Sequence, residues 1–306
     1  MSQITLRILE TSEEMVAVEN LQRLIWPGSE VDIVPAHLLL AVVHNGGLVI
    51  GAYSSEISTY ELHESSADLS LVGFVFGFPG LYHVQDGQRL KHCSHMLGVH
   101  PVQRDKGIGF SLKRAQWQMV RRQGLEQITW TFDPLLSRNA HLNISRLGAV
   151  CSTYLREVYG EMRDGINAGL PSDRFQVDWW VNTQRVNRRL SRQARNSLDL
   201  AHYFAGGAEL INPSVIDEAG YPHPATGNWE PQRVNGKYPP LLLVEIPSDF
   251  TALKANKPSL ALEWRMHSRD LFETLFATGY LVTDFVHLPG THPRSFYVLC
   301  HGESTL

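Results

Sequence analysis

The hydrophobic positions of this chain recur with two periods, which together predict a mixture of strands and helices. Short apolar or alternating runs, typical of strands, occupy residues 4–9, 48–54, 69–78, 92–99, 127–132, 149–154 and 175–181. Stripes with helical spacing occupy residues 11–24, 35–43, 109–122 and 138–147. Thr11 with Glu14 forms a capping-box pattern before the first helix, and Gly148 is a typical residue to end the last.

The order of these elements predicts the type of sheet. Residues 92–132 read as strand, helix and strand, and such a crossover makes its two strands parallel. The NGG turn at 45–47 leads into the strand at 48–54, which we expect to pair antiparallel with 69–78. We therefore predict an α/β fold with a mixed, mostly antiparallel sheet, a central parallel pair and flanking helices.

The pattern changes after residue 181. Five arginines follow at the spacing of one helix face: Arg185, Arg188, Arg189, Arg192 and Arg195. The favoured interpretation is a solvated or interface-facing helix surface, and the less favoured one is a contact to nucleic acid. Residues 205–240 are rich in Gly, Pro and Asn and predict irregular structure. Strands at 239–247, 280–288 and 295–301 surround a largely helical segment at 250–278. We predict two domains, residues 1–200 and a C-terminal α/β subdomain over 201–306.

Composition adds few constraints. The chain has 306 residues, of which 43% are hydrophobic and 19% charged, as in ordinary globular proteins. The formal charge of −4 gives no overall footprint for nucleic acid or an anionic membrane. The N-terminus lacks a signal-peptide pattern, and no apolar run approaches the roughly 18 residues of a membrane span. Three distant cysteines, Cys93, Cys151 and Cys300, do not suggest a disulfide framework. A cytoplasmic protein is the expectation.

The turn between the strand at 92–99 and the helix at 109–122 carries the most specific chemistry. Gly107 and Gly109 let another molecule approach the backbone, and the first N–H groups of the helix suit a phosphate or pyrophosphate. Arg104 and Lys106 add positive charge. A Walker A loop requires GK followed by Ser or Thr, which is absent here, and Leu112 replaces the third glycine of a dinucleotide fingerprint.

The string RDKGIG, from Arg104 to Gly109, resembles the R/Q-x-x-G-x-G/A signature of the GCN5-related N-acetyltransferase (GNAT) superfamily. The strings HMLGV, SRNAHLN and DGINAGLPSDR are similar to a bacterial branch of acetyltransferases linked to N-acylamino acid metabolism, including N-succinylation. The signature and its neighbours cover about residues 91–149. The resemblance implies a sheet splayed at its parallel pair, an acetyl-CoA or other acyl-CoA co-substrate, and a small-molecule amine acceptor such as an amino acid.

The resemblance also implies roles for individual residues. The backbone of three strand residues would pair with the pantetheine arm: Leu97, Gly98 and Val99. N–H groups of the turn would hold the pyrophosphate: Arg104, Asp105, Lys106, Gly107, Ile108, Gly109 and Phe110. Ser137 and Asn139 are two candidates for the family's asparagine contact to the cofactor.

One position departs from the family pattern. Ile144 replaces the tyrosine that many members place four residues before the glycine, as the acid that protonates the leaving thiolate. The adjacent Asn143 carries an amide, which is a poor proton donor. Water, another side chain such as Tyr154, or departure without specific assistance are the alternatives.

His95 is the first candidate for the base that takes the proton of the amine, because imidazole titrates near neutral pH. Strict alternation places it on the same strand face as Cys93 and Leu97, and His92 on the other. A hydrogen-bonded packing role is the competing interpretation.

The glycine-rich segment at 161–174 is the candidate for acceptor binding. Arg174 would bind a carboxylate, and Asp164 or Asp173 an ammonium group, with Asn167 as a further polar contact. Ser172 and Asp173 fit equally well as turn caps. The histidines are not spaced as ligands, so no metal is expected.

Two classes of function follow. The first is an acyl-CoA-dependent N-acyltransferase, and the second is a non-catalytic acyl-CoA-binding sensor or interaction module, which Ile144 motivates. In either case the C-terminal part could serve protein interaction or dimerisation, which leaves a homo-oligomer open.

Overall fold

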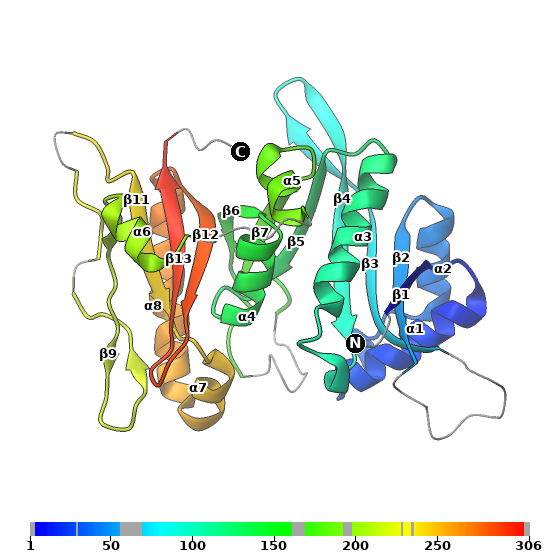
Figure 1. Ribbon diagram of the computed structural model, residues 1–306, viewed down its shortest axis with the longest axis horizontal. Helices are drawn as coiled ribbons and strands as arrows, with labels where there is room; N and C mark the ends of the chain where they lie inside the picture. Colours follow the sequence, from blue (N-terminus) through cyan, green and yellow to red (C-terminus); the bar gives the residue numbers. More distant parts are fainter. Residues whose placement is uncertain are drawn as a thin grey trace. The chain divides into compact units, whose positions relative to one another are not determined.

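The computed structural model describes residues 4–28, 30–55, 69–160, 169–191, 198–227, 229–233 and 236–302. These residues divide into two compact units, the first ending at Trp130 and the second beginning at Thr131. Figure 1 shows their helices and strands coloured along the chain. None of the helices in the described ranges combines the length and the apolar character that crossing a membrane requires. The expected division into residues 1–200 and 201–306 stays a prediction.

The first unit contains a sheet with the strand order β1-β2-β3-β4-β5. Its strands are β1 Thr5–Ile8, β2 Leu48–Ser54, β3 Ser70–Val84, β4 Gly87–Val99 and β5 Gln127–Phe132, of which the residues up to Trp130 belong to this unit. Neighbours run antiparallel except β4 and β5, which are parallel. Helix α3, Ile108–Arg122, forms the crossover between them, as the sequence predicts.

Helices cover both faces of this sheet because its strands alternate apolar side chains. Phe74 and Phe76 of β3 are buried in a cluster with α1, Ser12–Ile25, and α2, Ala36–His44. Val75 points the other way and packs with Ile108 and Leu112 of α3. This two-faced burial is what period-two alternation produces when both sides of a sheet are covered.

The capping box predicted at the start of α1 is present. The Thr11 hydroxyl accepts a hydrogen bond from the Glu14 N–H at 3.3 Å, and the Glu14 carboxylate accepts one from the Thr11 N–H at 3.0 Å. These two bonds satisfy backbone donors that the first turn of a helix leaves without partners.

β3 and β4 form a longer hairpin than the pattern predicts. The sequence indicated strands only at 69–78 and 92–99, whereas β3 continues to Val84 and β4 begins at Gly87. Side chains of this extension are mostly exposed or half-buried, so it lacks the apolar run by which a buried strand is recognised.

A β-bulge interrupts the register between β3 and β4. Phe76 lies opposite Met96 and Gly77 lies opposite Ser94, which leaves His95 as the extra residue on β4. Two consecutive residues of a bulged strand can point to one face, so strict alternation fails at this place.

The second unit contains strands in the order β7-β6-β12-β13-β11-β8, antiparallel except for β11 with β8. They are β6 Val150–Leu155, β7 Arg174–Trp180, β8 Glu209–Leu210, β11 Leu241–Ile246, β12 Tyr280–Leu288 and β13 Arg294–His301, and a separate pair is formed by β9 Val215–Ile216 and β10 Pro222–His223. Its helices are α4 Ser137–Ala140, α5 Gln184–Leu190, α6 Leu200–Ala205, α7 Phe250–Asn256 and α8 Pro258–Ala277. The predicted fold class is confirmed, including the C-terminal α/β extension.

The helix predicted at 138–147 has an unusual centre. α4 continues as a π-helix over His141–Arg146, and the Leu147 N–H donates to the Leu142 carbonyl, five residues earlier, at 2.9 Å. Ile144 lies in this π-helix with its side chain fully buried. π-Helical turns are rare in proteins, and those that occur are often found at functional sites.

Two of the clustered arginines face the interior of the second unit. The Arg185 Nε donates to the Gly148 carbonyl at 3.0 Å, and Arg189 forms an ion pair with Asp284 at 2.6 Å. Arg192 and Arg195 lie outside the described residues. The favoured interpretation was a solvated or interface-facing surface, so for Arg185 and Arg189 it is replaced by a packing role.

Candidate functional site

The parallel pair of β4 and β5 separates after two residue pairs. His92 lies opposite Ile128 and Cys93 opposite Thr129, whereas β4 continues to Val99. Beyond Cys93, β4 stays paired with β3 on its other side as far as Val99. The edge of β4 at Leu97, Gly98 and Val99 is therefore not part of the ladder with β5. An extended ligand can join such an edge as an added strand.

Gly98 holds this strand end close to α1. A Cβ at this position would lie 2.7 Å from the Ile25 Cδ1 and 2.9 Å from the Phe74 Cε1. Leu97 and Val99 pack on the opposite side, in the cluster that contains Ile108 and Leu112. The end of the strand is therefore packed on both of its faces.

The turn from β4 to α3 has the left-handed backbone that its glycine implies. Gly107 has a φ of +78° and precedes the first helical residue, Ile108. A Cβ on Gly107 would meet no atom within 4 Å, so the space in front of the helix N-terminus is open. Asp105 also adopts a positive φ, 65°, although it is not a glycine. This conformation is uncommon for a residue with a side chain and clusters at ligand-binding turns.

The helix N-terminus offers an anion its backbone N–H groups. The Ser111 N–H donates to the carbonyl of Gly107, the residue that precedes α3, at 3.1 Å. The N–H groups of Ile108, Gly109 and Phe110 belong to the first turn, where helix geometry supplies no carbonyl four residues back within the helix. A phosphate bound there would also be favoured by the helix dipole.

Both the backbone and the side chain of Arg104 form hydrogen bonds to residues just before it in the chain. Its N–H donates to the Pro101 carbonyl at 3.3 Å within a short 3-10 turn, Pro101–Gln103. Its side-chain Nε donates to the carbonyl of Val99 at 3.4 Å. Arg104 thus links the turn to the end of β4, and its contact with a pyrophosphate stays a prediction.

His95 occupies the bulge and lies on a different face from the one that alternation predicts. Its ring packs 5.9 Å from the rings of both Phe76 and Phe78, whereas Leu97 packs on the α3 side. The shared face with Leu97 was wrong because the bulge adds one residue to the alternation. The ring remains exposed to solvent, and the apolar surroundings lower its pKa by desolvation.

A buried polar cluster lies under β4, and no local pattern along the chain indicates it. Lys113 of α3 is only 2% exposed, although lysine is usually a surface residue. Its Nζ donates to the Ser94 hydroxyl at 2.7 Å and to the Gln116 Oε1 at 3.2 Å, and it lies 3.6 Å from the centre of the Trp130 ring. Burial lowers the pKa of Lys113 well below its ordinary value.

His92 completes this cluster. Its Nε2 lies 3.1 Å from the Gln116 Nε2, and because the Gln116 Oε1 accepts from Lys113, the amide NH₂ faces the ring. The ring nitrogen therefore accepts, which requires neutral imidazole. Burial, reinforced by the charge of Lys113, lowers the pKa of His92 to about 3. As expected, His92 faces away from His95.

The candidates Ser137, Asn139, Asn143 and Tyr154 lie in the second unit. The Ser137 hydroxyl is buried and lies 2.9 Å from the Ser295 hydroxyl, whereas Asn139 is half-buried. Asn143 is buried in the π-helix. None of these observations assigns a contact to a cofactor, and their roles stay predictions.

Asp173 and Tyr154 form a buried cluster. Both oxygens of Asp173, which is fully buried, accept from Arg269 at 2.8 Å. The Tyr154 hydroxyl donates to Asp173 at 2.8 Å and the Glu157 N–H donates at 3.1 Å. Hydrogen bonds from Arg269 and Glu157 overcome the effect of burial and lower the pKa of Asp173, whereas burial raises the pKa of Tyr154. This geometry fits a structural role for Asp173.

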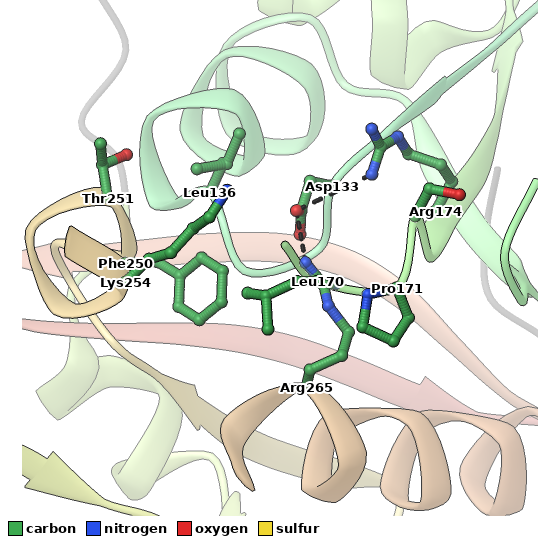
Figure 2. A pocket seen from close by; sticks show the side chains of 10 residues that line it. Asp133, Leu136, Leu170, Pro171, Arg174, Phe250, Thr251, Lys254 and Arg265 are labelled. Atoms are coloured by element: carbon green, nitrogen blue, oxygen red, sulfur yellow. Dashed lines mark hydrogen bonds and ion pairs between the residues drawn. The ribbon is translucent and has the colours of Figure 1, made fainter. Parts of the chain in front are cut away.

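Arg174 does not join the cluster around Asp173 but lies near Asp133 and Arg265, a group that the sequence did not indicate. Its Nη1 lies 3.8 Å from the Asp133 Oδ2, and the same oxygen accepts from Arg265 at 2.5 Å. Figure 2 shows this group at a pocket, with Arg265 projecting from α8 toward Asp133. Asp133 follows β5 and Arg265 lies 132 positions later, so no local pattern could have joined them. Asp164 and Asn167 lie outside the described residues.

Comparisons with known proteins give a partial likeness. No protein-family model matches the sequence, and no curated protein matches it. Arabidopsis thaliana NAA60 in complex with acetyl-CoA is 16% identical over 58% of this chain and 99% of its own, with a TM-score of 0.44. The ribosomal-protein-S18-alanine N-acetyltransferase from Escherichia coli is 13% identical over 64% and 99%, with a TM-score of 0.40. An N-acetyltransferase from Staphylococcus aureus Mu50 is 12% identical over 59% and 100%, with a TM-score of 0.41. Values this low record a likeness of part of the fold and carry no information on substrate.

Proposed function

We propose that this protein is an acyl-CoA-dependent N-acyltransferase of the GNAT superfamily. It would transfer an acetyl or short acyl group, such as succinyl, to the amine of a small molecule such as an amino acid. The observation that carries the proposal is the glycine turn at the start of α3, directly after a strand that has left its parallel partner. This pairing offers a pyrophosphate a helix N-terminus and a pantetheine arm a strand edge.

The chemistry would be direct transfer in a ternary complex. The neutral amine attacks the thioester carbonyl, a C–N bond forms, the C–S bond breaks and CoA leaves as the thiolate. Backbone N–H groups at the edge of β4 would stabilise the developing oxyanion. His95, exposed on the bulge and with a lowered pKa, would be neutral at physiological pH and able to take the amine proton.

Two described side chains that could be considered as the source of the thiolate's proton are not free to give one. Ile144 has no proton to give, and the Tyr154 proton is donated to Asp173. Solvent is therefore the source we propose. The same observation favours the second candidate function, a non-catalytic acyl-CoA-binding module, which would bind thioesters and release no thiol.

Binding of CoA thioesters to the full chain tests the cofactor. We expect Gly107→Glu to weaken acetyl-CoA binding by about 100-fold, because a carboxylate in the turn repels the pyrophosphate. Gly124→Glu is a matched control at the opposite end of α3, since Gly124 has a φ of +76° and equally open space around its Cβ position. Calorimetry with acetyl-, succinyl- and other short acyl-CoAs measures the effect.

The outcomes separate the hypotheses. Equal losses in both glutamate variants would show that backbone strain, and not the anion site, controls binding. If no CoA thioester binds at all, both the transferase and the sensor are excluded. If thioesters bind but a pool of amino acids and other amines releases no thiol, the sensor is favoured.

The pH dependence of thiol release tests His95. Because the apolar surroundings lower the pKa of His95, the acid limb of the kcat/KM profile should lie below pH 6.5. His95→Gln should lower kcat by about 100-fold and abolish that limb, with acetyl-CoA affinity unchanged. A variant that keeps the limb and the rate would show that His95 only packs on Phe76 and Phe78.

A further inference from the structure

The pocket in Figure 2 belongs entirely to the second unit and lies among positively charged groups. Its polar lining includes Asp133, Arg174, Lys254 and Arg265. Its volume is about 20 Å³, enough for one small polar group. Among the described residues that line the pocket, three carry a formal positive charge and one is a carboxylate, an excess of cationic groups within this lining.

Arg265 makes this excess significant because it is buried with donors to spare. Its side chain is 1% exposed, and its Nη2 binds Asp133. Its Nε and Nη1 atoms are buried and have no hydrogen-bond acceptor among the described residues. A buried guanidinium donor without an acceptor costs more free energy than the same group in water, which favours a ligand that supplies an acceptor.

Asp133 does not supply the hydrogen-bond acceptors that the Nε and Nη1 atoms of Arg265 lack. Its Oδ1 accepts from the Leu135 N–H at 2.9 Å, and its Oδ2 already accepts from Arg265 and lies near Arg174. The remaining walls contain apolar side chains, among them Leu136, Leu170 and Phe250. Such a lining suits a small planar anion on a short apolar body, and the limited volume disfavours a bulky phosphate ester.

We propose that this pocket is a binding site for the carboxylate group of a small ligand, held by Arg265 with Arg174 and Lys254. The inference rests on the proposed function only in naming one source of the carboxylate. That source is the amine acceptor, as in an amino acid, and the other is a free carboxylate that acts as an effector. Both present the same chemistry to Arg265, so experiment has to separate them.

Binding can be measured without any acyl transfer. Succinate and acetate should saturate a site on the full chain by calorimetry and raise its melting temperature, whereas acetamide, which is neutral and of the same shape, should do neither. Lys254→Gln should weaken succinate binding by about tenfold, the effect of losing one charged hydrogen-bond donor. Lys257→Gln removes the same charge three residues later, outside the pocket lining, and should leave binding unchanged.

Arg265→Gln should abolish saturable succinate binding. Because it also leaves Asp133 buried without its partner, the Lys254 and Lys257 pair keeps the test valid if this variant fails to fold. Absence of saturable carboxylate binding in the folded wild-type chain, or equal effects of acetate and acetamide, would overturn the proposal and leave the pocket to water.

Kinetics distinguish the two sources. If the carboxylate is the acceptor's, Lys254→Gln should raise KM for amino acids about tenfold, and leave amines without a carboxylate unaffected. If it is an effector, KM for the acceptor stays unchanged and added succinate alters the rate in the wild type only. Loss of CoA binding would contradict the proposed function without touching the carboxylate result.

Discussion

Asp173→Ala should reduce the free energy of unfolding by about 3–5 kcal/mol, the typical cost of removing one partner of a buried ion pair. The substitution leaves the Arg269 guanidinium, which is 8% exposed, without the two oxygens that accept from it at 2.8 Å. It also removes the acceptor of the Tyr154 hydroxyl and the Glu157 N–H. Urea denaturation of the full chain, followed by fluorescence, measures the loss.

Tyr154→Phe is the matched control, because it removes a single hydrogen bond to Asp173 and keeps the ring that packs on Phe175. We expect a loss of about 1 kcal/mol. If Asp173→Ala folded with wild-type stability but no longer used the amine, Asp173 would be an acceptor ligand, as the sequence also allowed. If Tyr154→Phe kept its stability and lost thiol release, Tyr154 would be the missing acid.

Lowering the pH should destabilise the first unit through the protonation of His92. The unfolded imidazole binds a proton near pH 6.5, whereas the folded one does so only near pH 3. Between these values the unfolded state holds more protons, so stability falls as the pH falls, by at most about 1.4 kcal/mol per pH unit and about 5 kcal/mol in total. Above pH 6.5 both states are neutral and the contribution is fully present.

His92→Gln isolates this contribution. The amide can keep a hydrogen bond with Gln116 but has no proton to bind in this range. The difference in unfolding free energy between wild type and variant should change steadily from pH 6.5 to pH 3 and stay constant above pH 6.5. A difference that stays constant over the whole pH range would show that His92 in the folded protein has the ordinary pKa of histidine.

The elements that the sequence predicts best are those with strong local signals. The capping box of Thr11 and Glu14, the crossover through α3 and the turn at Gly107 depend on residues close together in the chain, and the structure shows each of them. The β3–β4 hairpin was underestimated because its outer half is not buried, and burial is what the apolar pattern reports.

The site residues missed by the sequence depend on tertiary contacts. Lys113 looks like a surface residue in its helix, and only Ser94, Gln116 and Trp130 from separate positions explain its burial. The pair of Asp133 and Arg265 joins the end of β5 to the middle of a helix far along the chain. Residue type alone does not report such partners, because Lys and Arg are usually exposed.

The bulge at His95 divides β4 into two halves of opposite phase. Residues before it and residues after it obey alternation separately, and a search template that assumes one phase assigns half of the strand to the wrong face. An insertion or deletion of one residue here would exchange the apolar partners of α1 and α3 from that point to Val99. The number of residues between His92 and the glycine turn is therefore constrained more tightly than their identity, and relatives should be aligned on that spacing.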